Sequence, residues 1–373
     1  MGIKHRAFLD ALPLYESGRT PADVVRAQEL AGTAGPPEIA KLSSNESPYP
    51  PPAAVYAAVT EACAAGNRYP DFNNVSIVEA IAGRYDVDPA RVTVGNGSVS
   101  LVRDLCLITS GPSDEVVYAV PSFPAYGRSA QLAGATGVPV PLADETHDLD
   151  AMLKAATPQT SLVFVCNPNN PTGTTVGGAA LEDFIRAVPQ DVLVVLDEAY
   201  HEYVTDEETP DGLDFVRKYD NVAVIRTFSK AYSLAGFRVG YAISSVDVAG
   251  MIKKIETSYA VSLPAQAAAV ASLDPQVESE LLARVATIVR ERNRVADALE
   301  AMGVRVVPSQ ANFLYLPVGG RAVEVATEFE NRGVILRPIG QAGVRVTIGL
   351  PVENERFLAV ARELLDGLRC PRA

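Results

Sequence analysis

Short apolar runs alternate with helical patterns between about residues 53 and 245, and this alternation constrains the fold more than any other feature. The runs at 162–165, 192–196 and 222–225 contain only apolar residues. Strands without a polar face are buried on both sides, as in a parallel sheet covered by helices. Because helical patterns separate them, we expect a mainly parallel α/β sheet. The expected strands are 92–94, 115–120, 137–140, 162–165, 192–196, 222–225 and 239–243.

Polar motifs stand where three of these strands end. Segment 226–240 (RTFSKAYSLAGFRVG) places Lys230 on a turn after one strand and Arg238 eight residues later, and segments 163–173 (VFVCNPNNPTG) and 192–200 (VLVVLDEAY) also end in polar residues. Parallel sheets bind ligands beyond the carboxyl ends of their strands. A lysine can form a Schiff base with an aldehyde, and hydroxyls with an arginine can hold a phosphate. An aldehyde and a phosphate together describe pyridoxal phosphate (PLP).

In this order and spacing, NPNNPTG, DEAY and SKAYSLAGFRVG resemble the fold-type I PLP-dependent aminotransferases. The resemblance is greatest to the branch that contains the histidinol-phosphate and aromatic (phenylalanine) aminotransferases, and it runs from about residue 14 to residue 349. It implies an α/β fold with a mainly parallel seven-stranded sheet in a large domain, plus a smaller α+β domain. The implied boundaries are residues 53–260 for the large PLP-binding domain, and 1–52 with 261–373 for a discontinuous small domain.

The pattern changes after residue 263, where the expected small domain begins to dominate. A long helix rich in Ala, Leu, Arg and Glu is expected at 278–302. Further strands are expected at 305–307, 313–316, 334–337 and 344–348, and helices at 322–331 and 353–367.

The resemblance assigns catalytic roles to Lys230, Asp197 and Tyr200. Lys230 would be the Schiff-base lysine, and its released amine would move the proton in the 1,3-shift of transamination. A neighbouring cation would lower the pKa of that amine toward the operating pH. Asp197 would keep the ring nitrogen protonated, so that the ring accepts electrons. Asn170 and Tyr200 would contact the 3′ oxygen of the ring, and for Asn170 this is compatible with an Asn-Pro turn.

The phosphate of the cofactor is expected in a composite site. Segment 95–100 (GNGSVS) follows a strand and opens a helix, and backbone amides at a helix N-terminus bind anions. Many relatives carry an acidic pair where this chain has Val99 and Ser100, but binding through backbone amides should survive that difference. The expected cofactor ligands here are Gly97, Ser98, Val99, Thr227, Ser229 and Arg238.

Two aromatic residues are also expected at the cofactor. Phe123, in segment 121–126 (PSFPAY), lies where the family stacks an aromatic side chain on the ring, whereas Tyr126 is expected to be structural. Tyr69, in segment 67–71 (NRYPD), matches a tyrosine that reaches the phosphate of the neighbouring subunit. The resemblance therefore implies a homodimer with shared active sites.

Substrate contacts are assigned to four residues. Arg345, in segment 343–347 (GVRVT), matches the arginine that holds the α-carboxylate of the substrate, or the phosphate of histidinol phosphate, through two parallel bonds. Arg337 is a second cationic candidate. Tyr15 and Asn312 occupy family positions near the substrate.

The expected function is a ping-pong amino-group transfer between an aromatic amino acid, phenylalanine or tyrosine, and 2-oxoglutarate. The segments NGSVSLV, HDLDAML, SQANFLYLP and GVRVTI favour the aromatic substrate. The alternative is histidinol-phosphate transamination in histidine biosynthesis, because both groups share their catalytic residues. A PLP-dependent phospho-amino-acid decarboxylase of the same fold is a further alternative. A PLP-sensing transcriptional regulator would need an additional DNA-binding domain, for which the extent of the resemblance leaves no room.

Bulk properties limit the class of protein and its partners. A net charge of −13 opposes a nucleic-acid partner, which would demand a basic face. No apolar run approaches the roughly 20 residues that span a bilayer, and the N-terminus lacks the apolar core of a signal peptide. The four cysteines show no CxxC pair and the three histidines lie far apart, so no metal is expected. These features predict a cytoplasmic enzyme.

Overall fold

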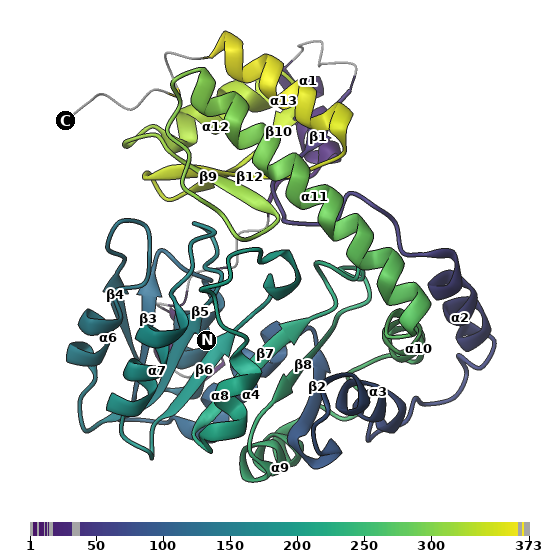
Figure 1. Ribbon diagram of the computed structural model, residues 1–373, viewed down its shortest axis with the longest axis vertical. Coiled ribbons are helices and arrows are strands. Elements are labelled where there is room, and N and C mark those ends of the chain that lie inside the picture. The colour runs from purple at the N-terminus through teal and green to yellow at the C-terminus, as the bar shows by residue number, and fades with distance from the viewer. Residues whose placement is uncertain are drawn as a thin grey trace.

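The computed structural model describes residues 3–5, 7–10, 12, 14, 18–31, 38–364 and 368. A larger domain is built on a seven-stranded sheet, and a smaller domain lies above it in Figure 1. The long helix α11 (Pro275–Ala301) connects the two. None of the helices in the described ranges is both long and apolar enough to span a bilayer.

The large sheet confirms the predicted α/β architecture. Its strand order is β2-β8-β7-β6-β5-β3-β4, and every neighbouring pair is parallel except those of β8, which runs antiparallel to β2 and β7. All seven expected strands are present. They are β2 (Val92–Asn96), β3 (Glu115–Val120), β4 (Thr136–Pro141), β5 (Thr160–Cys166), β6 (Leu193–Asp197), β7 (Val222–Thr227) and β8 (Val239–Ile243).

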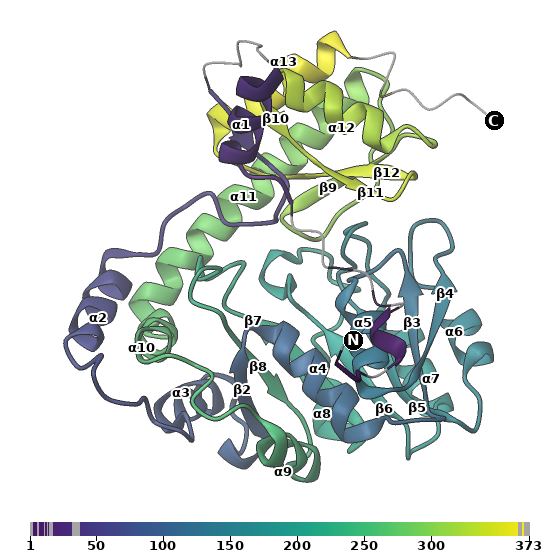
Figure 2. The same cartoon turned by 180° about the vertical axis from the view of Figure 1, so that it is seen from behind.

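Alternate residues of the central strands face two separate apolar cores. In β5, Phe164 belongs to the core beneath α4 and α5, whereas Val163 and Val165 belong to the core on the opposite face. Helices α6, α7 and α8 lie in front of the sheet in Figure 1, and α4, α5 and α9 lie in front of it in the reversed view of Figure 2. The helices of the large domain are α3 (Val75–Tyr85), α4 (Ser98–Thr109), α5 (Ala125–Ala133), α6 (Leu149–Ala155), α7 (Gly178–Ala187), α8 (Gly212–Lys218) and α9 (Val246–Ile255), with short 3-10 turns η2 (Pro89–Arg91) and η3 (His201–Tyr203).

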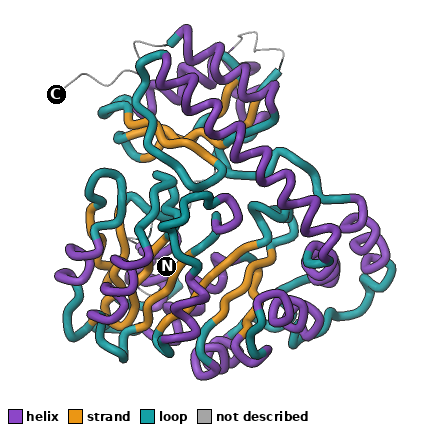
Figure 3. The backbone as a smooth tube through the Cα atoms, in the orientation of Figure 1, coloured by secondary structure: helices purple, strands orange, loops and turns teal. Residues whose placement is uncertain are grey.

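The small domain combines residues from both ends of the chain. A three-stranded antiparallel sheet has the order β11-β12-β9, and β1 pairs in parallel with β10. The tube in Figure 3 shows the helices of this domain gathered on one side of these strands. Its elements are β1 (Ala40–Lys41), β9 (Phe313–Pro317), β10 (Val334–Ile335), β11 (Arg337–Ile339), β12 (Gly343–Thr347), α1 (Pro21–Ala31), α12 (Ala322–Asn331) and α13 (Pro351–Glu363); the 3-10 turn η1 (Ala7–Asp10) precedes them in the chain.

Two strand predictions in the C-terminal part were wrong. Residues 305–307 form no strand, and only an isolated bridge joins Val307 to Tyr315. Pro308 follows at once and has no N–H to continue the ladder. The expected strand 334–337 is divided between β10 and β11, which belong to different sheets. Helix α11 begins three residues earlier than predicted, because Asp274 caps it by accepting from the amides of Gln276 and Val277.

Helix α10 (Leu263–Ser272) packs against α2 (Ala53–Cys63) and α3. A domain boundary at residue 260 therefore assigns α10 to the small domain, although its neighbours are counted in the large one. The first turns of α11 also contact α10, so α11 runs from this helix cluster into the small domain (Figure 1).

A buried ion pair joins β6 to β7 on the face that α8 covers. The fully buried guanidinium of Arg226 donates to Glu198 Oε2 at 2.7 and 2.9 Å and to Asp211 Oδ1 at 2.6 Å. Glu198 Oε1 accepts from the amide of Gly212 at 2.7 Å, at the start of α8. Every oxygen of Glu198 thus has a donor, which offsets part of the desolvation of the charges.

We expect Arg226→Met to lower the free energy of unfolding by about 3 kcal/mol, because Glu198 would remain as an uncompensated buried charge. Arg186→Met breaks an exposed ion pair with Glu182 and should leave the unfolding midpoint close to that of the unchanged protein. Urea denaturation followed by circular dichroism measures both variants. Equal shifts of the two midpoints would contradict a special role for the buried pair.

Candidate active site

A cavity of about 720 Å³ lies between the carboxyl ends of the large-sheet strands and the small domain. Residues 43–46 and 337–340 close it from the small-domain side. Twelve of the residues selected from the sequence line this cavity, namely Ser98, Val99, Phe123, Asn170, Asp197, Tyr200, Thr227, Ser229, Lys230, Arg238, Arg337 and Arg345.

Lys230 stands on the turn after β7 and reaches into the cavity. Its Nζ donates to the carbonyl oxygen of Ser44 at 3.3 Å and lies 5.9 Å from the centre of the Tyr200 ring. Burial lowers the pKa of the lysine to about 7, and the charges of Arg345 and Arg238 act in the same direction. A lysine with this pKa has a substantial neutral fraction near pH 7 and can act as a nucleophile or a base.

Asp197 ends β6 and is almost fully buried at the cavity wall. Its Oδ2 accepts from the hydroxyl of Tyr126 at 2.8 Å, and its Oδ1 accepts from the amide of Ala199 at 3.3 Å. Burial raises the pKa of this carboxyl to about 6, whereas the two hydrogen bonds lower it. The contact with Tyr126 was not foreseen from the sequence, in which Tyr126 has the pattern of a core aromatic.

Tyr200 is held from the small-domain side by Asn45, which the sequence did not single out. Asn45 Nδ2 donates to the Tyr200 hydroxyl at 2.9 Å, and Asn45 Oδ1 accepts from Thr347 Oγ1 at 3.0 Å. Burial raises the pKa of Tyr200, so its hydroxyl stays protonated. Asn312 donates to the backbone oxygen of Asn45 at 3.2 Å and is not among the residues that line the cavity. Tyr15, the remaining substrate candidate, lies outside the described residues.

The N-terminus of α4 and the side chain of Arg238 face each other across a very small gap. Gly97 caps the helix with a φ of +72°, and a Cβ at this position would lie 2.2 Å from an Arg238 nitrogen. A Cβ on Gly240 would lie 2.4 Å from the amide nitrogen of Ser98. Glycines at both positions therefore keep the first amides of α4 and the guanidinium close together.

The donors around this gap suit a phosphate group. Amides in the first turn of a helix have no intrahelical acceptor, and they carry the positive end of the helix dipole. Arg238 also lies 3.4 Å from the hydroxyl of Ser229, to which it donates. The amide of Ser229 in turn donates to Thr227 Oγ1 at 3.1 Å. Amides, a hydroxyl and a guanidinium converge here, and the residues fit the phosphate of PLP.

A second cationic group lies on the small-domain side of the cavity. Arg345 on β12 donates to Asn170 Oδ1 at 2.5 Å and to the carbonyl oxygen of Ser43 at 2.7 Å, and it lies 5.4 Å from the Phe313 ring centre. Arg337 is its partner in register on β11, so both arginines reach the same side of the cavity. A planar guanidinium held in this way can bind a carboxylate through two parallel hydrogen bonds.

The two expected aromatic contacts lie in different surroundings. Phe123 lines the cavity after β3, with its ring edge-to-face against Tyr126 at 5.7 Å. Tyr69 lies between α2 and α3 with 81% of its surface exposed, and it stacks on Tyr259 at 4.6 Å. Tyr69 is not among the residues that line the large cavity of its own chain.

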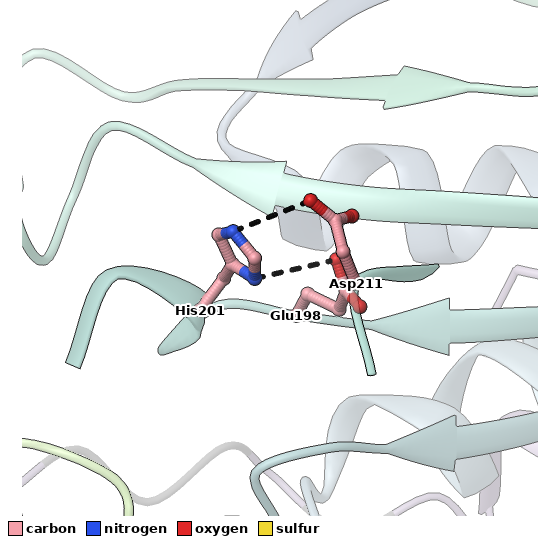
Figure 4. Close-up of side chains that lie close together, drawn as sticks. All are labelled: Glu198, His201 and Asp211. Carbon is pink, nitrogen blue, oxygen red and sulfur yellow. Dashed lines mark ion pairs between the residues drawn. The ribbon is translucent and has the colours of Figure 1, made fainter. Parts of the chain in front are cut away.

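One cluster in the described ranges has ligand types and spacing that suit a metal ion. Glu198, His201 and Asp211 bring three such atoms within 4.8 Å of one another (Figure 4). Glu198 directly follows β6, His201 begins η3, and Asp211 caps α8. Arg226 already donates to both carboxylates, so a guanidinium supplies the positive charge within this cluster.

Comparisons with known proteins agree with this geometry. A family model described as aminotransferase class I and II matches residues 37–360. An aromatic amino acid aminotransferase of Streptomyces coelicolor is 49% identical over 96% of this chain and 97% of its own length. A protein of the same name from Thermobifida fusca is 48% identical over 96% of both chains.

Solved structures show the same similarity. Histidinol-phosphate aminotransferase from Sinorhizobium meliloti, in complex with pyridoxal-5′-phosphate, superposes with a TM-score of 0.86 at 26% identity over 99% of both chains. An aspartate aminotransferase from Thermotoga maritima gives a TM-score of 0.84 at 26% identity, over 97% of this chain and all of that one.

We expect Gly97→Ala to weaken PLP binding by at least about tenfold, because its Cβ would displace Arg238 and an L-residue with positive φ is strained. Gly236→Ala is the matched control, since a Cβ at Gly236 meets no atom within 4 Å. Fluorescence titration of the cofactor-free protein with PLP measures both affinities. Unchanged affinity in Gly97→Ala would remove this gap from the phosphate site.

Proposed function

The chain belongs to the class I and II aminotransferases, which use PLP, and we propose that it transfers the amino group of phenylalanine or tyrosine to 2-oxoglutarate. The observation that carries the aromatic assignment is full-length similarity: relatives 45–49% identical over nearly the whole chain are named aromatic amino acid aminotransferases. A histidinol-phosphate aminotransferase shares the fold at lower identity, so histidinol phosphate is the substrate to test against.

The proton transfer is assigned to Lys230. When bound, PLP supplies an aldehyde that condenses with amino groups and a ring that accepts electrons from the substrate. The amine of Lys230, with its pKa near 7, takes the proton from the substrate Cα and returns it to the carbon of the former aldehyde. Asp197 holds a proton on the ring nitrogen, and Tyr200 and Asn170 flank the same cavity for contact with the ring oxygen.

Two groups of residues anchor the ends of the cofactor and substrate. The first amides of α4, together with Ser229, Arg238 and Thr227, hold the phosphate. Phe123 packs on the ring, which is worth roughly 0.5–1.5 kcal/mol beyond burial. Arg345 binds the α-carboxylate of the amino acid, and Arg337 provides a second positive charge beside it.

A second copy of the chain is proposed to complete each site. The support is the exposed aromatic pair Tyr69–Tyr259, which neighbours a second cavity of about 410 Å³. Phe72 and Tyr259 line this cavity together with Val99 of the α4 N-terminus, so it opens beside the proposed phosphate site. In a homodimer, Tyr69 of one subunit would donate to the cofactor phosphate of the other.

Single-turnover reactions test the substrate. Holoenzyme is mixed with phenylalanine, tyrosine, histidinol phosphate or aspartate, and the loss of the visible cofactor absorbance is followed by stopped flow. We expect kcat/KM for phenylalanine or tyrosine to exceed that for histidinol phosphate by at least about tenfold. A preference for histidinol phosphate would overturn the aromatic assignment, and release of carbon dioxide would indicate a decarboxylase.

Mixed dimers test the shared site. Lys230→Ala should be inactive and Tyr69→Ala strongly impaired, since one loses the base and the other a phosphate contact. A heterodimer of the two variants keeps one site in which both residues are present. Refolding an equal mixture should therefore restore about a quarter of the wild-type activity in a symmetric dimer. No gain over Tyr69→Ala alone would place Tyr69 in the site of its own chain, or outside it.

A further inference from the structure

Tyr126 makes a direct contact with Asp197, the residue assigned to the ring nitrogen. Its hydroxyl donates to Asp197 Oδ2 at 2.8 Å from helix α5, and its side chain is fully buried. The Tyr126 ring stacks on Phe164 of β5 at 4.4 Å with an interplanar angle of 13°. Phe123 meets the same ring edge-on. The ring is thus fixed on two sides, so the hydroxyl has a defined direction toward the carboxylate.

We propose that Tyr126 is a positioning residue for amino-group transfer, which fixes the Asp197 carboxylate and keeps it in the ionised form that holds the proton on the cofactor ring nitrogen. The inference rests on the proposed pairing of Asp197 with that nitrogen. Asp197 has two oxygens: Tyr126 holds Oδ2 and the amide of Ala199 holds Oδ1. A carboxylate held by two donors can present its remaining lone pairs to the ring nitrogen without turning.

Several ionisable groups face Asp197 from the elements around it. Tyr126 lies on α5. Cys166, on β5, is the partner of Asp197 in the strand register. Glu198 directly follows Asp197 after the end of β6, Tyr200 lies in the following turn, and Lys230 lies on the loop after β7. Burial raises the pKa of Asp197, and Glu198 raises it further. The hydrogen bond from Tyr126 is the largest effect that lowers it, ahead of the Ala199 amide and Lys230.

Tyr126 acts as a donor and not as an acid. Burial and the charge of Asp197 raise the pKa of Tyr126 well above its ordinary value, so the phenol keeps its proton. A neutral donor that bonds to a carboxylate stabilises the charged form and lowers its proton affinity. Without this donor, Asp197 would compete more strongly for the proton on the ring nitrogen. The ring would then accept electrons less readily, while Arg345 would still bind the substrate carboxylate.

The test uses Tyr126→Phe holoenzyme loaded with PLP that carries ¹⁵N in the ring. Phenylalanine keeps both ring contacts and removes only the hydroxyl. The ¹⁵N chemical shift is followed across pH, and we expect the nitrogen to lose its proton at a pH about one unit lower than in wild type. We also expect kcat to fall about tenfold with an unchanged KM for the amino acid.

Tyr118→Phe is the matched control, because it removes a hydroxyl from a ring centred 6.5 Å from that of Tyr126. Its nitrogen titration should follow wild type. Site-specific 3,5-difluorotyrosine at position 126 provides a stronger donor of similar shape, and it should move the titration to higher pH. If Tyr126→Phe titrates with wild type, the proposal for Tyr126 is overturned. If the nitrogen is unprotonated in wild type throughout, the assignment of Asp197 fails first, and the two failures are distinct.

Discussion

The buried ion pair between Glu198 and Arg226 is the interaction on which the geometry of the site depends. Asp197 ends β6 and bonds to Tyr126 of α5, whereas Glu198, the next residue, bonds to the amide of Gly212 at the start of α8. Arg226 reaches Glu198 from the next strand, four residues before Lys230. The pair therefore ties the strand end that carries Asp197 to the one that leads to Lys230. The pair lies on the side of the sheet that α8 covers, and neither residue lines the cavity.

The arginines that are proposed to bind anions also lower the pKa of Lys230. Burial is the main cause that lowers the pKa of Lys230, and Arg345 at the proposed carboxylate site and Arg238 at the proposed phosphate site lower it further. Asp197 and Glu46 oppose them, and the result is a pKa of about 7. The two arginines proposed to bind anions thus add to the effect of burial on the amine that lies between them.

The sequence predicted the large sheet and the polar residues at its edge, because both follow from local pattern. Apolar runs identify strands buried on both faces, and residues after such strands must gather at one edge. Contacts that depend on tertiary packing could not be predicted from the local sequence pattern. Tyr126 reads as a core aromatic, and its partner Asp197 lies 71 residues away in sequence. The divided strand at 334–337 likewise depends on distant partners, because β1 pairs with its first half (β10) and β12 with its second (β11).

Asn45 shows why no single motif contains the whole site. Its side-chain amide donates to Tyr200 of the large domain and accepts from Thr347 of β12 in the small one. Arg345 lies two residues from Thr347 and on the same face of that strand. One asparagine thus sets the distance between a proposed ring contact and the proposed carboxylate ligand. An aspartate would lose the donor to Tyr200, and a serine could not reach both partners. The geometry of the proposed substrate site therefore depends on a side chain outside the motifs that predicted the chemistry.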